Sequence, residues 1–283
     1  HYLVAQAAEI LGLGRQIVLT HVDVESYNNH YALKDGIVCV PLEQTAEALV
    51  NKGGMARGKI EMVGAMVHPL LLDGRRERME RSAAQLEAGE VNMVVMLSGA
   101  RPKQHEAQVV EMLKSLARND RKTKVRMLIF PGLVKPGRVD ILERVAQDLG
   151  LRVGRSTDTY LGDPSVDVVM LHAGTLSEAV YLKAKALQEA NMQVTMASEN
   201  WGNEWAGGLP TILMDPQVGP ACKANAAFLR EYGVPTLGEG GDLKALLPGL
   251  IRRASLDYGD KLVPEAGGIR KTVDVILAKA RVF

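Results

Sequence analysis

One pattern recurs along the chain: a short apolar run, then a turn, then a segment with apolar residues at helical spacing. The clearest example is Val91–Leu97, an almost continuous apolar run, which is followed after a turn by Gln104–Arg118 with its apolar residues on one helical face. Such a run is typical of a strand covered on both faces of a parallel sheet. Strands that alternate with helices of this length indicate βαβ units. We therefore predict an α/β protein built on parallel sheets.

The pattern falls into two series, which we interpret as two Rossmann-like domains. The first domain is expected to be incomplete at its N-terminal side, because few strands fall in it. We place this partial domain at residues 1–88, the second domain at 89–262 and a helix that crosses back to the first at 263–283. The predicted strands are Gln16–Thr20, Gly36–Val40, Lys59–Val63, Val91–Leu97, Val125–Phe130, Leu151–Arg155, Val166–Leu171, Met192–Met196 and Pro210–Met214. The predicted helices are Leu42–Asn51, Asp73–Ala88, Gln104–Arg118, Arg138–Leu149, Thr175–Ala190, Asn225–Tyr232 and Gly268–Ala280.

Composition narrows the class of function. The 283 residues carry a formal net charge of +1, which argues against a general nucleic-acid binder, because that function needs an excess of Lys and Arg. Cys39 and Cys222 are too few for a disulfide scaffold or a zinc cluster, and they favour a reducing compartment. No run approaches the roughly 20 apolar residues of a membrane span. The GxGxxG and GxxxxGK[ST] motifs are absent, which disfavours a nicotinamide dinucleotide and a P-loop nucleotide.

Ligands of parallel sheets bind beyond the carboxyl ends of the strands, so the residues that follow each strand are the candidates. The turn at Gly99 either lets backbone N–H groups approach a phosphate or is an ordinary strand-to-helix turn. His172 and Gly174 follow another predicted strand. His172 either contacts a ligand or acts in acid–base chemistry, or it is a hydrogen-bonded loop histidine. His21 and Asp23 follow the first predicted strand and face the same cleft if the first domain mirrors the second.

The segment 197–205 is the most unusual in the chain. It holds both tryptophans of a protein that is only 4% aromatic, together with several polar side chains. Such a mixture at a strand end suits a ligand site, although tryptophans that pack between a helix and the sheet are an equally open interpretation. A metal site at His21, Asp23 and Glu25 is not convincing, because no second cluster of ligands accompanies them.

Taken in order, these segments resemble the GT-B glycosyltransferases, in particular the branch that contains monogalactosyldiacylglycerol synthase, processive diacylglycerol glucosyltransferases and the MurG-type enzymes. Leu13–Asp23 is similar to the family's stretch that ends in "vvTDl", and Asp35–Gly64 to its stretch that ends in "kI.v.G". Met192–Leu229 is similar to the stretch that contains "EA...GlP" and "Na.fl". Pro264–Ala280 resembles the family's closing helix. The resemblance covers nearly all of the chain.

This resemblance implies a GT-B fold, with a nucleotide-sugar site in the second domain and an acceptor site in the first. It implies an inverting transfer of a hexose from a UDP-sugar to a lipid acceptor such as diacylglycerol, without a cofactor. The protein would work at a membrane surface on the reducing side, in the cytoplasm or at the plastid envelope.

The resemblance also suggests site residues. Glu204 falls on the glutamate that holds the ribose hydroxyls, and Asn225 on an asparagine near the sugar. Backbone N–H groups after the strands would stabilise the leaving diphosphate. The candidate bases are His21, Asp23 and His30. The predicted substrate-binding residues are Gly99, His172, Gly174, Ser198, Asn200, Trp201, Gly202, Glu204 and Asn225.

Departures from the family's motifs keep a second hypothesis open. The family's "KAGPGT" is replaced by Met196–Trp201, so its lysine is lost and Glu199 arrives where a diphosphate should sit. Two like charges about 4 Å apart repel by about 4 kcal/mol at an effective dielectric of 20. The alternative is therefore a catalytically degenerate GT-B protein that serves as a structural or complex subunit and binds a protein partner.

Overall fold

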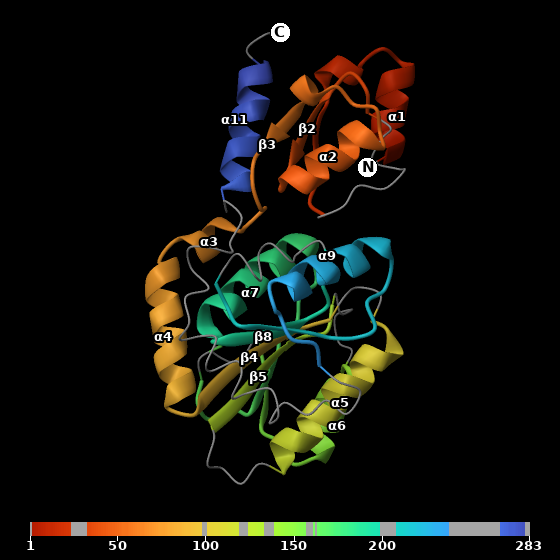
Figure 1. The fold of residues 1–283 in the computed structure, drawn as a ribbon. Coiled ribbons are helices and arrows are strands. Elements are labelled where there is room, and N and C mark those ends of the chain that lie inside the picture. Colours follow the sequence, from red (N-terminus) through yellow and green to blue (C-terminus); the bar gives the residue numbers. More distant parts are fainter. Residues whose placement is uncertain are drawn as a thin grey trace.

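The computed structural model describes residues 2–23, 33–97, 101–118, 124–132, 139–156, 161, 163–198, 208–237 and 267–280. Within these residues the chain forms two separate parallel sheets, one of three strands and one of six, each flanked by helices (Figure 1). The predicted α/β class with parallel sheets is confirmed. We call the two halves the small lobe and the large lobe after the sheets that they contain.

The small lobe is built on β1 (Val18–Thr20), β2 (Ile37–Val40) and β3 (Ile60–Met62), in the order β1-β2-β3. Two helices of the N-terminal part belong to it, α1 (Tyr2–Ile10) and α2 (Glu43–Asn51). Apolar side chains of α1, α2 and the strands share one core: Ala5, Val38, Val40, Ala46, Leu49 and Ile60. The strands and α2 fall inside their predicted ranges. Helix α1 was not predicted, because no capping side chain marks its start in the sequence.

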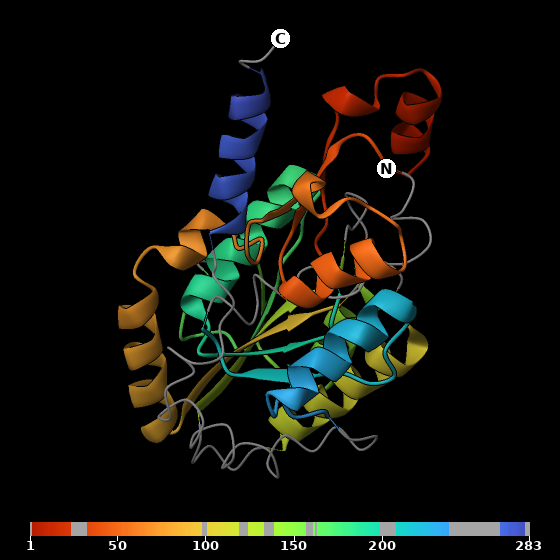
Figure 2. The same cartoon turned by 45° about the horizontal axis from the view of Figure 1, so that its top comes forward.

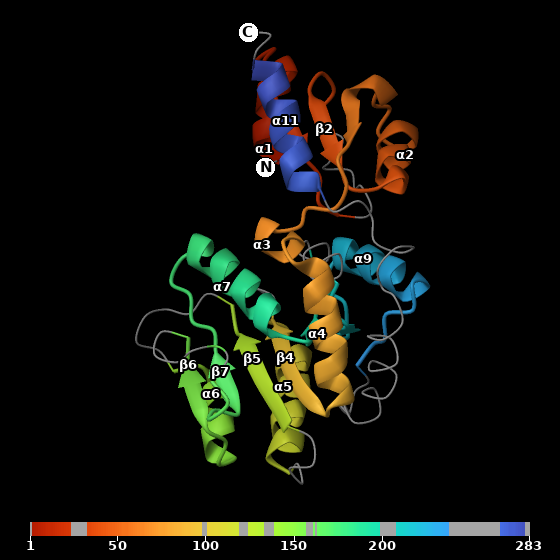
Figure 3. The ribbon, with the colours of Figure 1, turned by 90° about the vertical axis from the view of Figure 1, so that its left-hand side faces the viewer.

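A helix from the far end of the chain completes the small lobe. Figure 3 shows α11 (Gly268–Ala280) beside the small sheet, although the large sheet separates them in sequence. Gly268 N donates to Ala65 O at 3.1 Å, and Thr272 is buried. A Cβ atom on Gly268 would lie 2.5 Å from Gly64 O, so only glycine permits the helix to start this close to the backbone.

The six strands of the large lobe are all parallel, in the order β6-β7-β5-β4-β8-β9. Side chains of the central strand alternate between the two faces, so that Met93 and Val95 enter one core and Val94 and Met96 the other. The strands are β4 (Glu90–Met96), β5 (Lys124–Phe130), β6 (Val153–Arg155), β7 (Val168–Met170), β8 (Met192–Thr195) and β9 (Thr211–Leu213).

Helices cover both faces of this sheet (Figure 1). Helices α5 (Lys103–Ala117) and α6 (Ile141–Asp148) pack into the core on one face. Helix α7 (Leu176–Glu189) packs on the other face, and α9 (Pro220–Glu231) packs over Leu213 of the edge strand. Helices on both faces of a parallel sheet define the doubly wound arrangement expected of a Rossmann-like domain.

The segment between the two sheets packs on the large sheet. It forms α3 (Pro69–Leu72) and α4 (Arg75–Glu87). Leu71 of α3 joins the core beneath α7, and Leu86 of α4 joins the core on the opposite face. Helix α4 thus lies with the large lobe, although it precedes the predicted limit at residue 88. The limits at 88 and 262 remain predictions.

The topology sets the place of a ligand site. From β4 the chain moves to β5 on one side, and it later returns to β8 on the other side of β4. Ligands of doubly wound sheets bind at this point, where neighbouring strands lead their connections in opposite directions. The segments that follow β4 and β8, residues 98–100 and 199–207, lie outside the described residues, and their flanks define the site that follows.

Candidate functional site

The small lobe contributes the residues that follow β1. His21 continues the strand, because its backbone N donates to Cys39 O at 2.8 Å, and it is 4% exposed. Its ring Nδ1 accepts a hydrogen bond of 3.3 Å from the backbone N of Asp23. An Nδ1 atom that accepts carries no proton, so the neutral imidazole holds its proton on Nε2. His21 therefore fixes the backbone on which the Asp23 carboxylate is placed.

The large lobe meets Asp23 through Asn225 of α9. Asn225 is fully buried, and its Nδ2 donates to Asp23 Oδ1 at 3.1 Å. The same nitrogen lies 3.3 Å from the backbone oxygens of Ala197 and Ser198, which follow β8. Asn225 thus joins the strand end of the small lobe to the strand end beside the switch point of the large lobe.

Asp23 has a further contact within the small lobe. Thr45 Oγ1, in the first turn of α2, donates to the backbone O of Asp23 at 3.4 Å. Thr45 is itself fully buried. A loop residue that contacts a strand-end histidine, a helix of its own lobe and a helix of the other lobe is held in a defined place, as a catalytic group requires.

The turn after β8 is also fixed from the side of β9. Ala197 N donates to Gln217 Oε1 at 3.1 Å, and Gln217 Nε2 donates to Met214 O at 2.5 Å. The backbone N of Ser198 donates to Met196 O at 2.7 Å, so this amide is already engaged. Any backbone N–H groups that meet a diphosphate here must come from residues beyond Ser198.

A second group of charged residues lies at the carboxyl ends of β4 and β5. Arg101 donates from both terminal nitrogens to Asp140, and its Nε lies 2.8 Å from Glu106 Oε1. Asp140 also caps α6 by accepting from Leu142 N at 2.9 Å. Burial opposes the charge of Arg101, but the hydrogen bond and charge of Asp140, with Glu106, raise the pKa of Arg101. Two carboxylates therefore neutralise Arg101, which anchors the flank of segment 98–100.

His172 belongs to a third group, at the ends of β6 and β7. Its backbone N donates to Ser156 Oγ at 3.0 Å, and its Nε2 lies 3.6 Å from Glu143 Oε2. The Glu143 side chain is 3% exposed, and its Oε1 accepts from Arg155 Nε at 2.9 Å. His172 thus sits beside a buried carboxylate, with 17% of its side chain exposed. Both interpretations of His172, as a ligand contact or as a hydrogen-bonded loop histidine, remain open.

Gly174 takes part in the start of α7. Its backbone N donates to Glu178 Oε2 at 2.8 Å, and Glu178 N donates to Thr175 Oγ1 at 3.2 Å. These two bonds form the capping box predicted from Thr175 and Glu178. The amide of Gly174 is therefore engaged in the helix start.

Of the residues predicted from the sequence, the structure brings His21, Asp23, Asn225 and the backbone of Ser198 to one junction between the lobes. His172 and Gly174 lie at the end of β7, in a separate hydrogen-bonded group. The remaining predicted residues lie outside the described part of the chain: His30, Gly99, Asn200, Trp201, Gly202 and Glu204.

Sequence reasoning missed several residues that build the junction and its surroundings. Asp140, directly before α6, carried a helix-capping signal that could have singled it out. Thr45, Gln217, Arg101 and Glu143 gave no such signal, because their partners lie far away in the sequence. Within the described residues, no three His, Cys, Asp or Glu side chains are arranged to hold a metal ion. None of the described helices is long and apolar enough to cross a membrane.

Comparisons with known proteins bear on the fold. No protein-family model and no curated protein sequence matches the chain. The solved structure of UDP-GlcNAc 2-epimerase from Neisseria meningitidis bound to UDP-GlcNAc is similar, with a TM-score of 0.55, 14% identity, and 97% of this chain and 73% of that chain covered. UDP-GlcNAc 2-epimerase from Methanocaldococcus jannaschii gives a TM-score of 0.53 and 12% identity, over 98% of this chain and 71% of that one.

A third similar structure is MurG from Acinetobacter baumannii, with a TM-score of 0.51, 13% identity, and 97% of this chain and 68% of that chain covered. At these identities the likeness concerns the fold. Each similarity extends over both lobes, which agrees with the two parallel sheets and the C-terminal helix that returns to the small lobe. The chain therefore has the GT-B fold, as its resemblance to the GT-B superfamily predicts.

Proposed function

We propose that the protein is a glycosyltransferase that moves a hexose from a UDP-sugar to an acceptor hydroxyl. The carrying observation is the position of Asp23, whose carboxylate lies between the lobes and accepts from Asn225 Nδ2 at 3.1 Å. In a two-lobed nucleotide-sugar enzyme the acceptor and the donor meet at this junction. The neighbours known to bind UDP-GlcNAc support a nucleotide sugar as the donor. A lipid acceptor such as diacylglycerol, at a membrane surface, completes the proposal.

Asp23 is the proposed general base. Direct displacement at the anomeric carbon inverts its configuration and needs a group that accepts the proton of the attacking hydroxyl. A carboxylate has acceptor capacity on both oxygens, so Asp23 can hold Asn225 and still receive a proton. His21 is the weaker choice, because its Nδ1 already accepts from Asp23 N and its Nε2 carries the proton. We assign His21 the role of positioning Asp23.

The donor is proposed to lie at the carboxyl ends of β4 and β8. Its diphosphate would be met by backbone N–H groups of segments 98–100 and 199–207, as the family resemblance implies, with Glu204 on the ribose. Arg101 contributes little net positive charge, because Asp140 and Glu106 neutralise it. Its proposed part is to hold the start of α5 in place, so that the preceding segment keeps one conformation.

The alternative proposal is a GT-B protein without turnover that acts as a subunit of a complex. The feature that favours it is Glu199, an acid in the segment where a diphosphate would have to bind. In this case the contact between Asp23 and Asn225 would serve to fix the two lobes relative to each other.

The test is the release of UDP from UDP-glucose and UDP-galactose in the presence of dioleoylglycerol in lipid vesicles. Asp23→Asn should lower turnover by about 10²–10⁴-fold, the usual contribution of a general base, and should leave UDP binding in place. Asp148→Asn, at an exposed carboxylate near the end of α6, is the matched control and should keep full turnover. Equal rates in Asp23→Asn and the unchanged protein would refute the assignment. Conversion of UDP-GlcNAc into its epimer without an acceptor would refute group transfer.

A further inference from the structure

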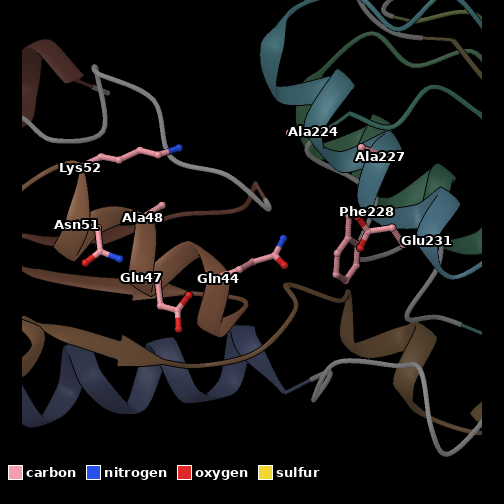
Figure 4. A pocket seen from close by; sticks show the side chains of 9 residues that line it. All are labelled: Gln44, Glu47, Ala48, Asn51, Lys52, Ala224, Ala227, Phe228 and Glu231. Carbon is pink, nitrogen blue, oxygen red and sulfur yellow. The ribbon is translucent and has the colours of Figure 1, made fainter.

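A groove runs between α2 of the small lobe and α9 of the large lobe. It has a volume of about 360 Å³, and Figure 4 shows the side chains of both helices that line it. This volume falls within the range of about 300–1,000 Å³ that is typical of small-molecule sites. Figure 2 shows α2 (orange) and α9 (blue) facing each other across the junction of the lobes.

The groove lies beside the proposed catalytic base. Gln44 on α2 lines it, and the next residue, Thr45, donates to the backbone O of Asp23 at 3.4 Å. Ala224 on α9 lines it as well, and the next residue, Asn225, donates to the carboxylate of Asp23. The two helices that form the groove are therefore the two that hold Asp23, and a molecule in the groove has a short path to that carboxylate.

The lining has the chemistry of a site for a neutral molecule with several hydroxyl groups. Gln44 and Asn51 offer amides that both donate and accept, and Glu47 and Glu231 offer carboxylates that accept from hydroxyls. The Phe228 ring, 7% exposed and braced edge-on against Tyr232 at 4.9 Å, gives the groove an apolar wall. In the close-up, Gln44 extends from α2 toward this ring (Figure 4).

The charges of the lining disfavour an anion. Its two carboxylates, Glu47 and Glu231, outnumber its single cation, Lys52. A phosphate or a diphosphate in the groove would face a net negative charge. The groove is for this reason a poor second site for the UDP moiety and a better one for an uncharged sugar ring.

We propose that this groove binds a neutral glycosyl unit of the acceptor and presents its free hydroxyl to Asp23. The inference rests on the proposed function and specifies it: the acceptor carries a sugar ring, so the enzyme extends an existing glycoside. A lipid without a sugar has no group that would use the two amides and two carboxylates of the groove.

The experiment fills the groove without disturbing the core. Ala227 lines the groove and is exposed, so Ala227→Phe occupies the space that the ligand needs. Ala107→Phe, at an exposed position of α5, is the matched control. The probes are methyl β-glucoside, methyl β-galactoside and N-acetylglucosamine, observed by saturation-transfer NMR, with inorganic phosphate as the anionic comparison.

At least one of the three sugars should bind the unchanged protein and the Ala107→Phe variant. Ala227→Phe should weaken its binding by about tenfold or more, as the loss of a complementary pocket does. Gln44→Ala should weaken it by about fivefold to tenfold, the effect of one lost hydrogen bond. No binding of any of the sugars, equal binding in Ala227→Phe, or binding of phosphate alone would overturn the proposal.

A parallel titration with UDP separates the two proposals. If UDP raises the unfolding temperature of the unchanged protein and of Ala227→Phe equally, the donor site exists and the sugar data judge the groove alone. If UDP has no effect on either protein, the proposed function itself is refuted, whatever the sugars do.

Discussion

Asn225 Nδ2 donates to Asp23 Oδ1 at 3.1 Å, and the two residues are 202 positions apart in the chain. This bond joins the end of the first strand of the small lobe to the helix that follows the last strand of the large lobe. Because Asn225 also holds the backbone oxygens of Ala197 and Ser198, one buried amide fixes both sides of the junction.

Replacement of this amide by a carboxylate should make stability depend on pH. In Asn225→Asp, two carboxyl groups face each other at hydrogen-bond distance, so one of them keeps its proton above its ordinary pKa of about 3.9. A carboxyl pKa that is raised in the folded state costs stability as pH rises. Urea unfolding should show a loss of stability from about pH 4 to pH 7 that is absent in the unchanged protein. Asn51→Asp, at an exposed position of α2, should show no comparable slope. Parallel curves for the two variants would contradict the contact.

Removal of the amide is predicted to destabilise at all pH values. Asn225→Ala leaves the Asp23 carboxylate and two backbone oxygens without this donor. The cost should be about 1–3 kcal/mol of the free energy of unfolding, as for other buried polar groups that lose their partner. Denaturant midpoints at pH 7 measure it. A change below a few tenths of a kcal/mol would mean that the bond contributes nothing.

His105 should make the protein less stable in acid. It is fully buried in α5, and its Nε2 lies 2.8 Å from Pro216 O. Burial lowers the pKa of His105 below its ordinary value, against smaller opposing effects of Pro216 and Asp215. The unfolded chain then binds more protons than the folded one as pH falls below about 6.5, so stability decreases with acidity. His105→Gln should flatten the dependence of the unfolding temperature on pH between about 5 and 6.5. An unchanged slope would show that another group is responsible.

The seat of α11 can be tested with a pair of neighbouring glycines. A Cβ atom on Gly268 would meet Gly64 O at 2.5 Å and Ala65 O at 2.6 Å, whereas one on Gly267 would meet only Lys271 Cε at 3.9 Å. Gly268→Ala should therefore destabilise by about 1–3 kcal/mol, the usual cost of overpacking. Gly267→Ala should stay close to the unchanged protein. Thermal unfolding of both variants decides the matter, and equal midpoints would argue against the close approach.

Breaking the ion pair at the start of α5 should cost less when the helix cap is kept. Asp140→Asn retains a side chain that can cap α6, while Asp140→Ala loses both the cap and the partner of Arg101. We expect the alanine variant to be less stable than the asparagine variant by about 1 kcal/mol, measured in urea. The opposite order would show that the cap contributes little.

Local patterns in the sequence were sufficient for most of the fold. Runs such as Val91–Leu97 are strongly apolar because both faces of the strand are covered, and Gly150 marked the end of α6. Helix α9 begins at Pro220, five positions before the predicted start at Asn225, because its first turn is set by Gly219 and Pro220 rather than by an apolar stripe. Helix α4 was found, but its packing on the large sheet depends on contacts of Leu86 that no local pattern encodes.

The site was only partly predictable for the same reason. Strand-end logic selected His21 and Asp23, and the family resemblance selected Asn225. Neither indicated that these side chains meet, because the bond joins residues of different lobes. The partners of Arg101 and His172, Asp140 and Glu143, became evident only when the strand order placed the ends of β4 to β7 next to one another.

The most direct test of the account is a calorimetric titration of the protein with UDP, accompanied by its unfolding temperature. A GT-B enzyme that uses UDP-sugars should bind UDP, and at 100 times the dissociation constant the ligand should stabilise the fold by about 2.7 kcal/mol. Glu204→Ala should weaken the binding, because it removes the predicted ribose contact. Absence of heat and of any stabilisation at millimolar UDP would contradict a nucleotide-sugar enzyme.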